Sequence, residues 1–279
     1  MPREPEATAA PLGGSLTHAL GLDFEEGGDI WRGDARIPAT GWLPGFPFPR
    51  ASVLLSFADT IAGSQVRALT LPRLSVTVEL TLDVVMANPG QRPIEHLEIE
   101  STLRRRGKRI FITETTFALP DGTMVAVCGG TFSAISRTDS ARPDSGEPRS
   151  NDNGRLLSGS VADRIGIRSL SPGVAEIALR NDLGNSTNSL MGGLTAILGE
   201  MAALSRLRAD AETDHLVERL QIRYLTPIDF GPARAEVRLV GGPPGHPVVL
   251  VEVRDTALPD AVAADLTLWC RPVPHTPEG

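Results

Sequence analysis

The amino-acid sequence predicts an α+β protein made of two copies of one unit, each a long helix followed by antiparallel strands. Three observations support this prediction. A polar stretch rich in Ser, Asp, Pro and Gly divides the 279-residue chain near its middle. The same order of predicted elements occurs on both sides of it. Short patterns also recur at nearly constant spacing, which is the signature of a duplicated structural unit.

Two pairs of segments define the repeat outside the helices. Ala118-Leu-Pro-Asp121 returns as Ala257-Leu-Pro-Asp260, in each case just before a last strand, at an offset of 257 − 118 = 139. Apolar residues alternate in 78–82 and again in 220–224, each time after a predicted helix, at an offset of 220 − 78 = 142. Two units that differ only by small changes in loop length would produce such offsets.

The first unit is expected at residues 16–136, after a tail at 1–15 whose Pro, Ala, Glu and Gly content predicts disorder. A first strand at 29–37 precedes a loop at 38–49, which has too many prolines for a helix or a central strand. A helix follows and stops before Pro72. β-Branched and alternating residues then predict a meander of four antiparallel strands. The helix is expected at 50–69 and the strands at 74–85, 94–103, 109–118 and 123–135.

The second unit is expected at residues 158–273, after a linker at 137–157 that is almost wholly polar and cannot supply a core. Its elements repeat those of the first unit. A strand precedes a polar loop that runs into a long helix, and four strands follow. The expected positions are 174–179 for the first strand, 185–208 for the loop and helix, and 216–224, 233–239, 248–255 and 261–269 for the later strands.

Composition limits the function. The chain is 41% hydrophobic and 22% charged, as globular proteins are, and its net charge of −7 argues against a general nucleic-acid binder. No apolar run reaches the roughly 20 residues that span a membrane, and no apolar signal segment opens the chain. The two cysteines, Cys128 and Cys270, form no metal or disulfide pattern. We therefore expect a cytoplasmic protein without a metal or redox cofactor, and without a nucleic-acid or membrane partner.

The stretch that begins the second helix has the residues of a binding site. Asn185 and its neighbours are polar, Gly192 and Gly193 let a ligand or another segment approach the backbone, and Glu200 follows eight residues after Gly192. The pattern Asn185-x6-Gly-Gly-Leu-Thr-Ala-x3-Glu200 resembles the loop and helix of PaaI-type acyl-CoA thioesterases, and 220–231 is similar to the strand that follows in that family. A departure is Met191, where the family has histidine.

This resemblance implies a tandem, or double, hotdog fold, in which a curved antiparallel sheet wraps each long helix. It also implies hydrolysis of an acyl-CoA thioester, with coenzyme A present only as part of the substrate. The backbone amide of Gly192 would polarise the thioester carbonyl, as a helix N-terminus can. Asn185 would orient the carbonyl or a water molecule, and a carboxylate would act as general base or attack directly. We expect homo-oligomers of such double units.

Helix geometry decides which carboxylate serves the Gly192 site. Eight helical residues place Glu200 about 12 Å along the axis from Gly192, too far to reach a carbonyl bound at the start of its own helix. Asp59 occupies the matching place in the first helix, since 200 − 59 = 141. We therefore predict a composite site of Asp59, Asn185 and Gly192. Glu200 would belong to a mirror-image site at residues 48–52, which lacks both the Asn and the Gly-Gly.

Simpler interpretations remain open. The Gly192-Gly193 pair is also explained by close packing of the helix on the sheet. Asp59 is also explained as a surface residue or as one that forms a hydrogen bond between helices. Arg104, Arg105 and Arg106 stand near a predicted hairpin turn, where they either protect a sheet edge or bind coenzyme A phosphates. A hotdog module that binds acyl-CoA without turnover is the alternative function. A hydratase is a weaker third, because no histidine stands near either helix start.

Overall fold

The computed structural model describes residues 16–43, 46–86, 93–136, 160–185, 187–211, 213–243 and 245–273. The predicted tail at 1–15 and the predicted linker at 137–157 lie outside the described residues. Within the described ranges, no helix combines the length and the apolar character that are needed to cross a membrane.

The first unit contains one long helix, α2 (Ala51–Thr70), and the long strands predicted around it. The helix ends where expected, because Leu71 precedes Pro72 and has an extended ψ of 136°. Short elements at the start of the chain were not predicted. The elements in order are α1 (Leu16–Ala19), β1 (Leu22–Glu25), β2 (Ile30–Arg36), a 3-10 turn (Ala39–Gly41), β3 (Trp42–Leu43), β4 (Phe46–Pro49), α2, β5 (Leu74–Val84), β6 (His96–Arg106), β7 (Ile110–Ala118) and β8 (Met124–Ile135).

The second unit repeats this order around the helix α4 (Gly192–Ala211), which has the same length as α2. Two short elements before it were again not predicted. The elements are α3 (Val161–Ile165), β9 (Ile167–Ser171), β10 (Val174–Ile177), a 3-10 turn (Asn181–Leu183), α4, β11 (His215–Tyr224), β12 (Ala233–Gly241), β13 (Val248–Asp255) and β14 (Val262–Pro272).

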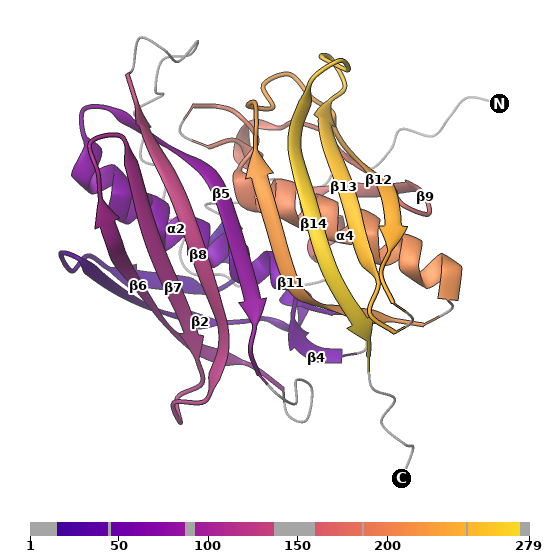
Figure 1. Ribbon diagram of the computed structural model, residues 1–279, viewed down its shortest axis with the longest axis horizontal. Coiled ribbons are helices and arrows are strands. Elements are labelled where there is room, and N and C mark those ends of the chain that lie inside the picture. Colours follow the sequence, from indigo (N-terminus) through magenta and orange to yellow (C-terminus); the bar gives the residue numbers. More distant parts are fainter. Residues whose placement is uncertain are drawn as a thin grey trace.

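The two units form one continuous sheet of twelve strands in the order β1-β2-β6-β7-β8-β5-β11-β14-β13-β12-β10-β9 (Figure 1). They join through the antiparallel pair β5 and β11, in which Leu80 faces Ile222 and Leu82 faces Leu220. The predicted meander is correct for β6, β7 and β8. It is wrong for β5, which lies between β8 and β11. Alternation along a strand shows which face is buried but does not identify the neighbouring strand.

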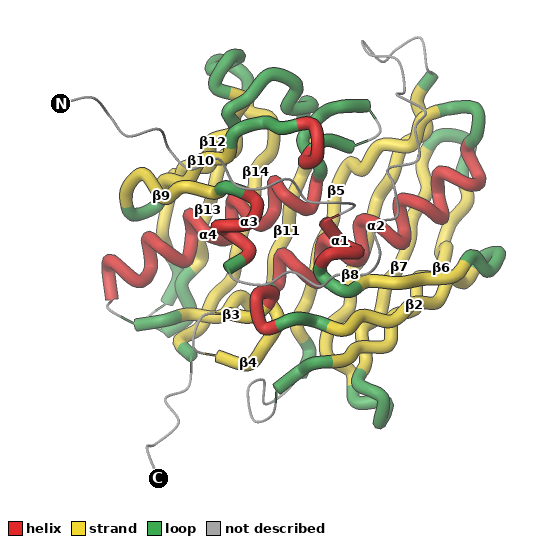
Figure 2. The backbone as a smooth tube through the Cα atoms, turned by 180° about the vertical axis from the view of Figure 1, so that it is seen from behind, coloured by secondary structure: helices red, strands yellow, loops and turns green. Residues whose placement is uncertain are grey.

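Both long helices lie on the same face of the sheet (Figure 2), with the core between helices and strands. They also pack against each other. The contact is close because Gly193 has no side chain, since a β-carbon there would lie 2.4 Å from Oγ and 3.2 Å from Cα of Ser56. Gly193 therefore allows close packing, but its partner is the other helix and not the sheet that the packing interpretation expected.

The structure corrects the register of the sequence repeat. In β5 the pairing with β8 is irregular between Thr77 and Glu79, and in β11 the pairing with β14 is irregular between Val217 and Arg219. These matching irregularities give an offset of 219 − 79 = 140, so residues 80 and 82 correspond to 220 and 222. The alternation was identified correctly, but the offset of 142 was wrong by two residues, which a period-two pattern cannot detect.

Candidate functional site

The loop before α4 is shaped by the side chain of Asn185. Its Oδ1 accepts hydrogen bonds from the backbone N–H and hydroxyl of Thr187, at 2.9 and 2.7 Å, and from the backbone N–H of Ser189 at 3.1 Å. Asn188 has a positive φ of 61°, which asparagine tolerates. The oxygen of Asn185 is thus committed to the loop. That the Asn185 side chain orients a carbonyl or a water molecule stays a prediction.

A buried carboxylate of the same unit, Asp255, holds this loop in place through Asp229. The hydroxyl of Ser189 donates to Oδ1 of Asp229 at 2.6 Å. The backbone N–H groups of Asp229, Phe230 and Gly231 in turn donate to the carboxylate of Asp255, at 2.9 to 3.0 Å. Burial acts to raise the pKa of Asp255, but these N–H groups together hold it below its ordinary value. The start of α4 is therefore fixed by a chain of hydrogen bonds.

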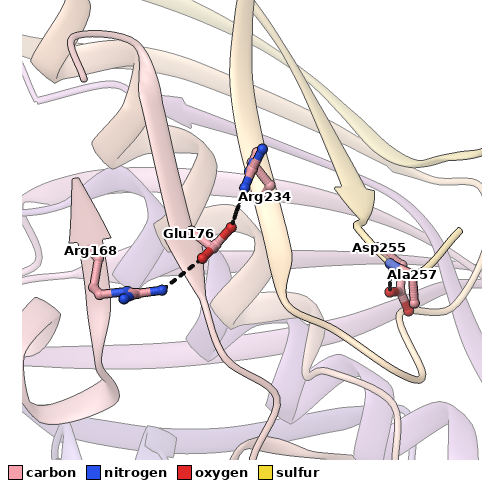
Figure 3. A network of polar contacts seen from close by, with 5 residues as sticks. All are labelled: Arg168, Glu176, Arg234, Asp255 and Ala257. Carbon is pink, nitrogen blue, oxygen red and sulfur yellow. Dashed lines mark hydrogen bonds and ion pairs between the residues drawn. The ribbon is translucent and has the colours of Figure 1, made fainter. Parts of the chain in front are cut away.

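A second network of ion pairs ties the edge of the sheet (Figure 3). Arg168 donates to Oε1 of Glu176 at 2.9 Å, and Arg234 donates to Oε2 at 2.7 Å. Burial acts to raise the pKa of Glu176, but the two guanidinium groups lower it. Figure 3 also shows the carboxylate of Asp255 accepting the backbone N–H of Ala257 at 3.0 Å. The two ion pairs of Glu176 join β9, β10 and β12 and have a structural role.

The first amides of α4 are open. The N–H groups of Leu194 and Thr195 donate to the carbonyl of Met191, at 3.0 and 3.2 Å. Within the described part of the chain, the N–H groups of Gly192 and Gly193 have no hydrogen-bond acceptor. Met191, just before the helix, packs against the core and is a packing residue. Open amides at a helix start carry partial positive charge and can bind an oxyanion.

Asp59 comes from α2 to this helix start. A β-carbon built on Gly192 would lie 2.9 Å from Oδ2 of Asp59. The other oxygen, Oδ1, accepts a hydrogen bond of 2.7 Å from the hydroxyl of Thr77 on β5. Burial raises the pKa of Asp59 from 3.8 to about 6, against the smaller opposing effect of Thr77. The structure thus brings Asp59 and Gly192 together, as the spacing argument predicts.

A phenol also lies beside Gly192. The same β-carbon would be 3.0 Å from Oη of Tyr224, at the end of β11. Sequence reasoning did not identify Tyr224 or Thr77 as site residues. Both stand on long strands, where periodicity indicates which face a residue occupies but not its distance from a helix. No sequence signal marked either residue.

Glu200 occupies the equivalent position at the start of α2, where it is fully buried. Its carboxylate accepts a hydrogen bond of 3.2 Å from the backbone N–H of Ala51 and a very short one from the hydroxyl of Ser52. Arg50 forms an ion pair with it at 3.8 Å. Burial raises the pKa of Glu200, and Arg50 opposes that rise. The carboxylate itself therefore closes this helix start.

The arginine cluster lies elsewhere. Arg104, Arg105 and Arg106 are exposed and form the end of strand β6, directly before the hairpin turn at 107–109, so the prediction that they stand near this turn is confirmed. The strand continues because Arg105 and Arg106 still pair with β7. Next to this turn, Arg73 donates to the carbonyl of Lys108 just after the end of α2, at 2.8 Å. Arg104 forms an ion pair with Glu114. The cluster thus lies near the C-terminal end of α2, away from the start of α4.

No group of three or more His, Cys, Asp or Glu side chains that could hold a metal ion is found within the described ranges. What the site can do follows from its groups. A carboxylate with a raised pKa can accept a proton near neutral pH, and open amides can stabilise negative charge on oxygen. Together they are suited to nucleophilic attack on a polarised carbonyl.

Comparisons with known proteins identify the fold. No family model and no curated protein matches the sequence. Among solved structures, the chain is similar to a proposed oleoyl thioesterase from Lactobacillus plantarum, with a TM-score of 0.63 and 11% identity over 89% of this chain and 98% of that one. It is also similar to the 12:0-ACP thioesterase from Umbellularia californica, with a TM-score of 0.60 and 11% identity over 88% and 94%.

A third similar structure is a protein of unknown function with a hot dog fold from Alicyclobacillus acidocaldarius, with a TM-score of 0.56 and 16% identity over 93% of this chain and 98% of that one. These likenesses cover nearly the whole of each chain. They confirm the predicted fold class, two hotdog units in tandem. At such identities they show the fold alone.

Proposed function

We propose that this protein hydrolyses acyl thioesters at a composite site between its two hotdog units. One observation carries the proposal. Asp59 of α2, with a pKa raised to about 6, lies against Gly192 at the start of α4, where two backbone amides are open. The names of two similar structures, a proposed oleoyl thioesterase and a 12:0-ACP thioesterase, agree with it.

In the proposed first step, the thioester carbonyl oxygen accepts the N–H of Gly192. Ionised Asp59 takes a proton from a water molecule, whose oxygen attacks the carbonyl carbon. A C–O bond forms, and the carbonyl π pair moves onto oxygen, where the helix N-terminus stabilises the charge. Thr77 holds the other oxygen of the carboxylate and so fixes its orientation.

In the second step the oxyanion re-forms the carbonyl, and the C–S bond breaks with its electron pair on sulfur. The proton held by Asp59 goes to the thiolate, which leaves a carboxylic acid and a thiol and returns the carboxylate. Direct attack by Asp59 would give a mixed anhydride instead. After a single turnover in ¹⁸O-labelled water, label in Asp59 identifies the anhydride route, because only attack of water on the aspartyl carbonyl of the anhydride places it there.

We propose that the thioester is an acyl-CoA and that the active half is of PaaI type. The loop and helix pattern from Asn185 to Glu200 supports this assignment. An acyl group on a carrier protein presents the same thioester chemistry, and one similar structure is named for that substrate. Parallel assays with acyl-CoA and acyl-carrier-protein substrates of several chain lengths decide between them.

Two further proposals concern the state of the protein. We propose a cytoplasmic location, which the two free and buried cysteines Cys128 and Cys270 support. We also propose that the double units associate into homo-oligomers, as the resemblance implies. Light scattering on the purified protein measures its oligomeric state.

The test compares Asp59→Asn with Glu200→Gln in a thiol-release assay. We expect Asp59→Asn to lower kcat by a factor of roughly 100 or more, since a general base contributes about 10²–10⁴-fold. Glu200→Gln should keep most of the activity, because its carboxylate is enclosed at the start of α2. Loss of turnover only in Glu200→Gln would show that the two sites have been assigned the wrong way round.

A module that binds acyl-CoA without turnover is the second candidate. Asn185 favours it, because the oxygen of its side chain already accepts three hydrogen bonds within its own loop and is not free to hold an attacking water molecule. Calorimetry with the same acyl-CoA panel separates the candidates. Tight binding without thiol release, in the wild-type chain, would reject the enzyme and retain the module.

A further inference from the structure

Tyr224 carries a buried hydroxyl that has no hydrogen-bond partner among the described residues. It is the only tyrosine in the chain and the last residue of β11. A buried polar group without a partner is unfavourable, and native proteins usually satisfy such groups. The hydroxyl is therefore an unused hydrogen-bonding group, and its position determines what it could bind.

The hydroxyl lies at the open start of α4. A β-carbon on Gly192 would be 3.0 Å from Oη of Tyr224 and 2.9 Å from Oδ2 of Asp59, so both groups border the space that the glycine leaves free. Asp59 accepts a hydrogen bond from the hydroxyl of Thr77 and none from the phenol of Tyr224. Gly192 and Asp59 each keep part of their surface accessible. The phenol and the open amides thus lie at one helix start.

The other buried hydroxyls without a partner lie at a different place. Thr113 and Thr115 stand on β7, in the part of the sheet that belongs to the first unit. The hydroxyl of Thr113 lies next to Gly130 on β8. They mark no helix start. Tyr224 alone among the unpartnered hydroxyls of the described residues lies beside the amides of Gly192.

The two-fold repeat supports a functional role for this hydroxyl. With the offset of 140 found for β5 and β11, Tyr224 corresponds to Val84 in the first unit. The helix start associated with that unit is closed by Glu200 and needs no further donor. The hydroxyl is thus present where the amides are open and absent where a carboxylate covers them.

Electrostatics fix the chemical role of the phenol. Burial, and then the nearby charge of Asp59, raise the pKa of Tyr224 well above 10. The phenol therefore keeps its hydrogen at neutral pH. Such a group is a hydrogen-bond donor and a poor proton donor, because a high pKa opposes release of the proton.

We propose that Tyr224 is a further catalytic residue, whose phenol donates a hydrogen bond to the thioester carbonyl oxygen together with the N–H of Gly192. The proposal rests on the proposed hydrolysis of acyl thioesters at this site. The phenol transfers no proton. It stabilises the oxyanion while water adds and while the C–S bond breaks, because a donor aimed at the developing negative charge lowers its energy.

The test is Tyr224→Phe, which removes one oxygen and keeps the ring. We expect kcat to fall by roughly 10²–10³-fold, as for loss of one oxyanion donor, with little change in KM. Thermal stability should stay the same or rise, because an unsatisfied buried hydroxyl is removed. Thr113→Val is the matched control. It removes another unpartnered buried hydroxyl and should leave kcat unchanged.

A second measurement does not need turnover. The probe is an acyl-CoA analogue in which CH₂ replaces the thioester sulfur, with ¹³C at the ketone carbonyl. Hydrogen-bond donors move the carbonyl resonance of the bound ketone downfield. We expect a smaller movement in Tyr224→Phe than in the wild type and in Thr113→Val.

The outcomes are distinct. A kcat within twofold of wild type in Tyr224→Phe, or an unchanged carbonyl resonance, overturns the role of Tyr224 while hydrolysis stands. A drop in kcat accompanied by a clear loss of stability would indicate a structural residue and also overturns it. If the wild type releases no thiol, the proposed function fails, and the ketone resonance alone then decides whether Tyr224 binds the carbonyl.

Discussion

Asp59→Asn should make the protein more stable at neutral pH while removing the proposed base. The pKa of Asp59 rises from 3.8 to about 6, mainly because of burial. An acid that holds its proton more tightly in the folded state lowers the stability of that state once it ionises. At about 1.4 kcal/mol per pH unit, the rise corresponds to about 3 kcal/mol.

The sign follows from the two states. Below about pH 4 the carboxyl is protonated in the folded chain and mostly so in the unfolded chain, so ionisation costs little. Between about pH 4 and 6 the unfolded chain ionises first, and the free energy of unfolding falls as the pH rises. Above about pH 6 the folded state carries the whole cost of ionising Asp59. Asparagine is neutral throughout and keeps an oxygen for Thr77.

Urea unfolding of both proteins at pH 4 and pH 8 measures the effect. We expect Asp59→Asn to exceed the wild type by about 3 kcal/mol at pH 8 and to differ much less at pH 4. Asp210→Asn, which alters an exposed ion pair with Arg206, is the control and should change little. An equal gap at both pH values, or no gain at pH 8, would refute the reasoning that Asp59 is a buried base kept at an energetic cost.

Three other predictions concern the frame of the site. Gly192→Ala places a methyl group against the site carboxylate and should lower kcat by roughly 100-fold, whereas Gly241→Ala, with open space around its β-carbon, should not. Glu200→Ala leaves Arg50 largely buried without its partner, and thermal unfolding should show a loss of roughly 3–5 kcal/mol. Asp255→Asn weakens the hydrogen bonds of a carboxylate whose pKa is lowered. The loss of stability, roughly 2 kcal/mol, should become smaller at acid pH, where the wild-type carboxylate is protonated. A loss that stays the same at all pH values would contradict the role assigned to that carboxylate.

The helices and long strands could be predicted because their patterns are strong. α2 and α4 were expected nearly where they lie, since apolar residues at helical spacing and the stop before Pro72 mark them. α1, β1, α3 and β9 were missed because segments of four or five residues give no readable period. The position of β5 was missed because its partner, β11, belongs to the other unit.

The arrangement of the candidate site was partly predictable. A rise of about 1.5 Å per residue places Glu200 too far from the start of its own helix to serve a site there, and the sequence repeat indicates Asp59 instead. The structure places Asp59 beside Gly192. Its catalytic role stays a prediction. Thr77 and Tyr224 could not be identified, since the side chains that surround a carboxylate depend on how two strands lie across a helix.

The sequence by itself determined that the chain is duplicated, and that both long helices carry an acid at an equivalent position. Both facts follow from local spacing, which the chain cannot change when it folds. Only the tertiary structure decided what each acid does. Packing of the two helices turns Glu200 onto the amide of Ala51 and the hydroxyl of Ser52, and leaves Asp59 beside the open amide of Gly192. Contacts between residues more than a hundred positions apart are set by strand order and helix packing, and neither is written in a local pattern.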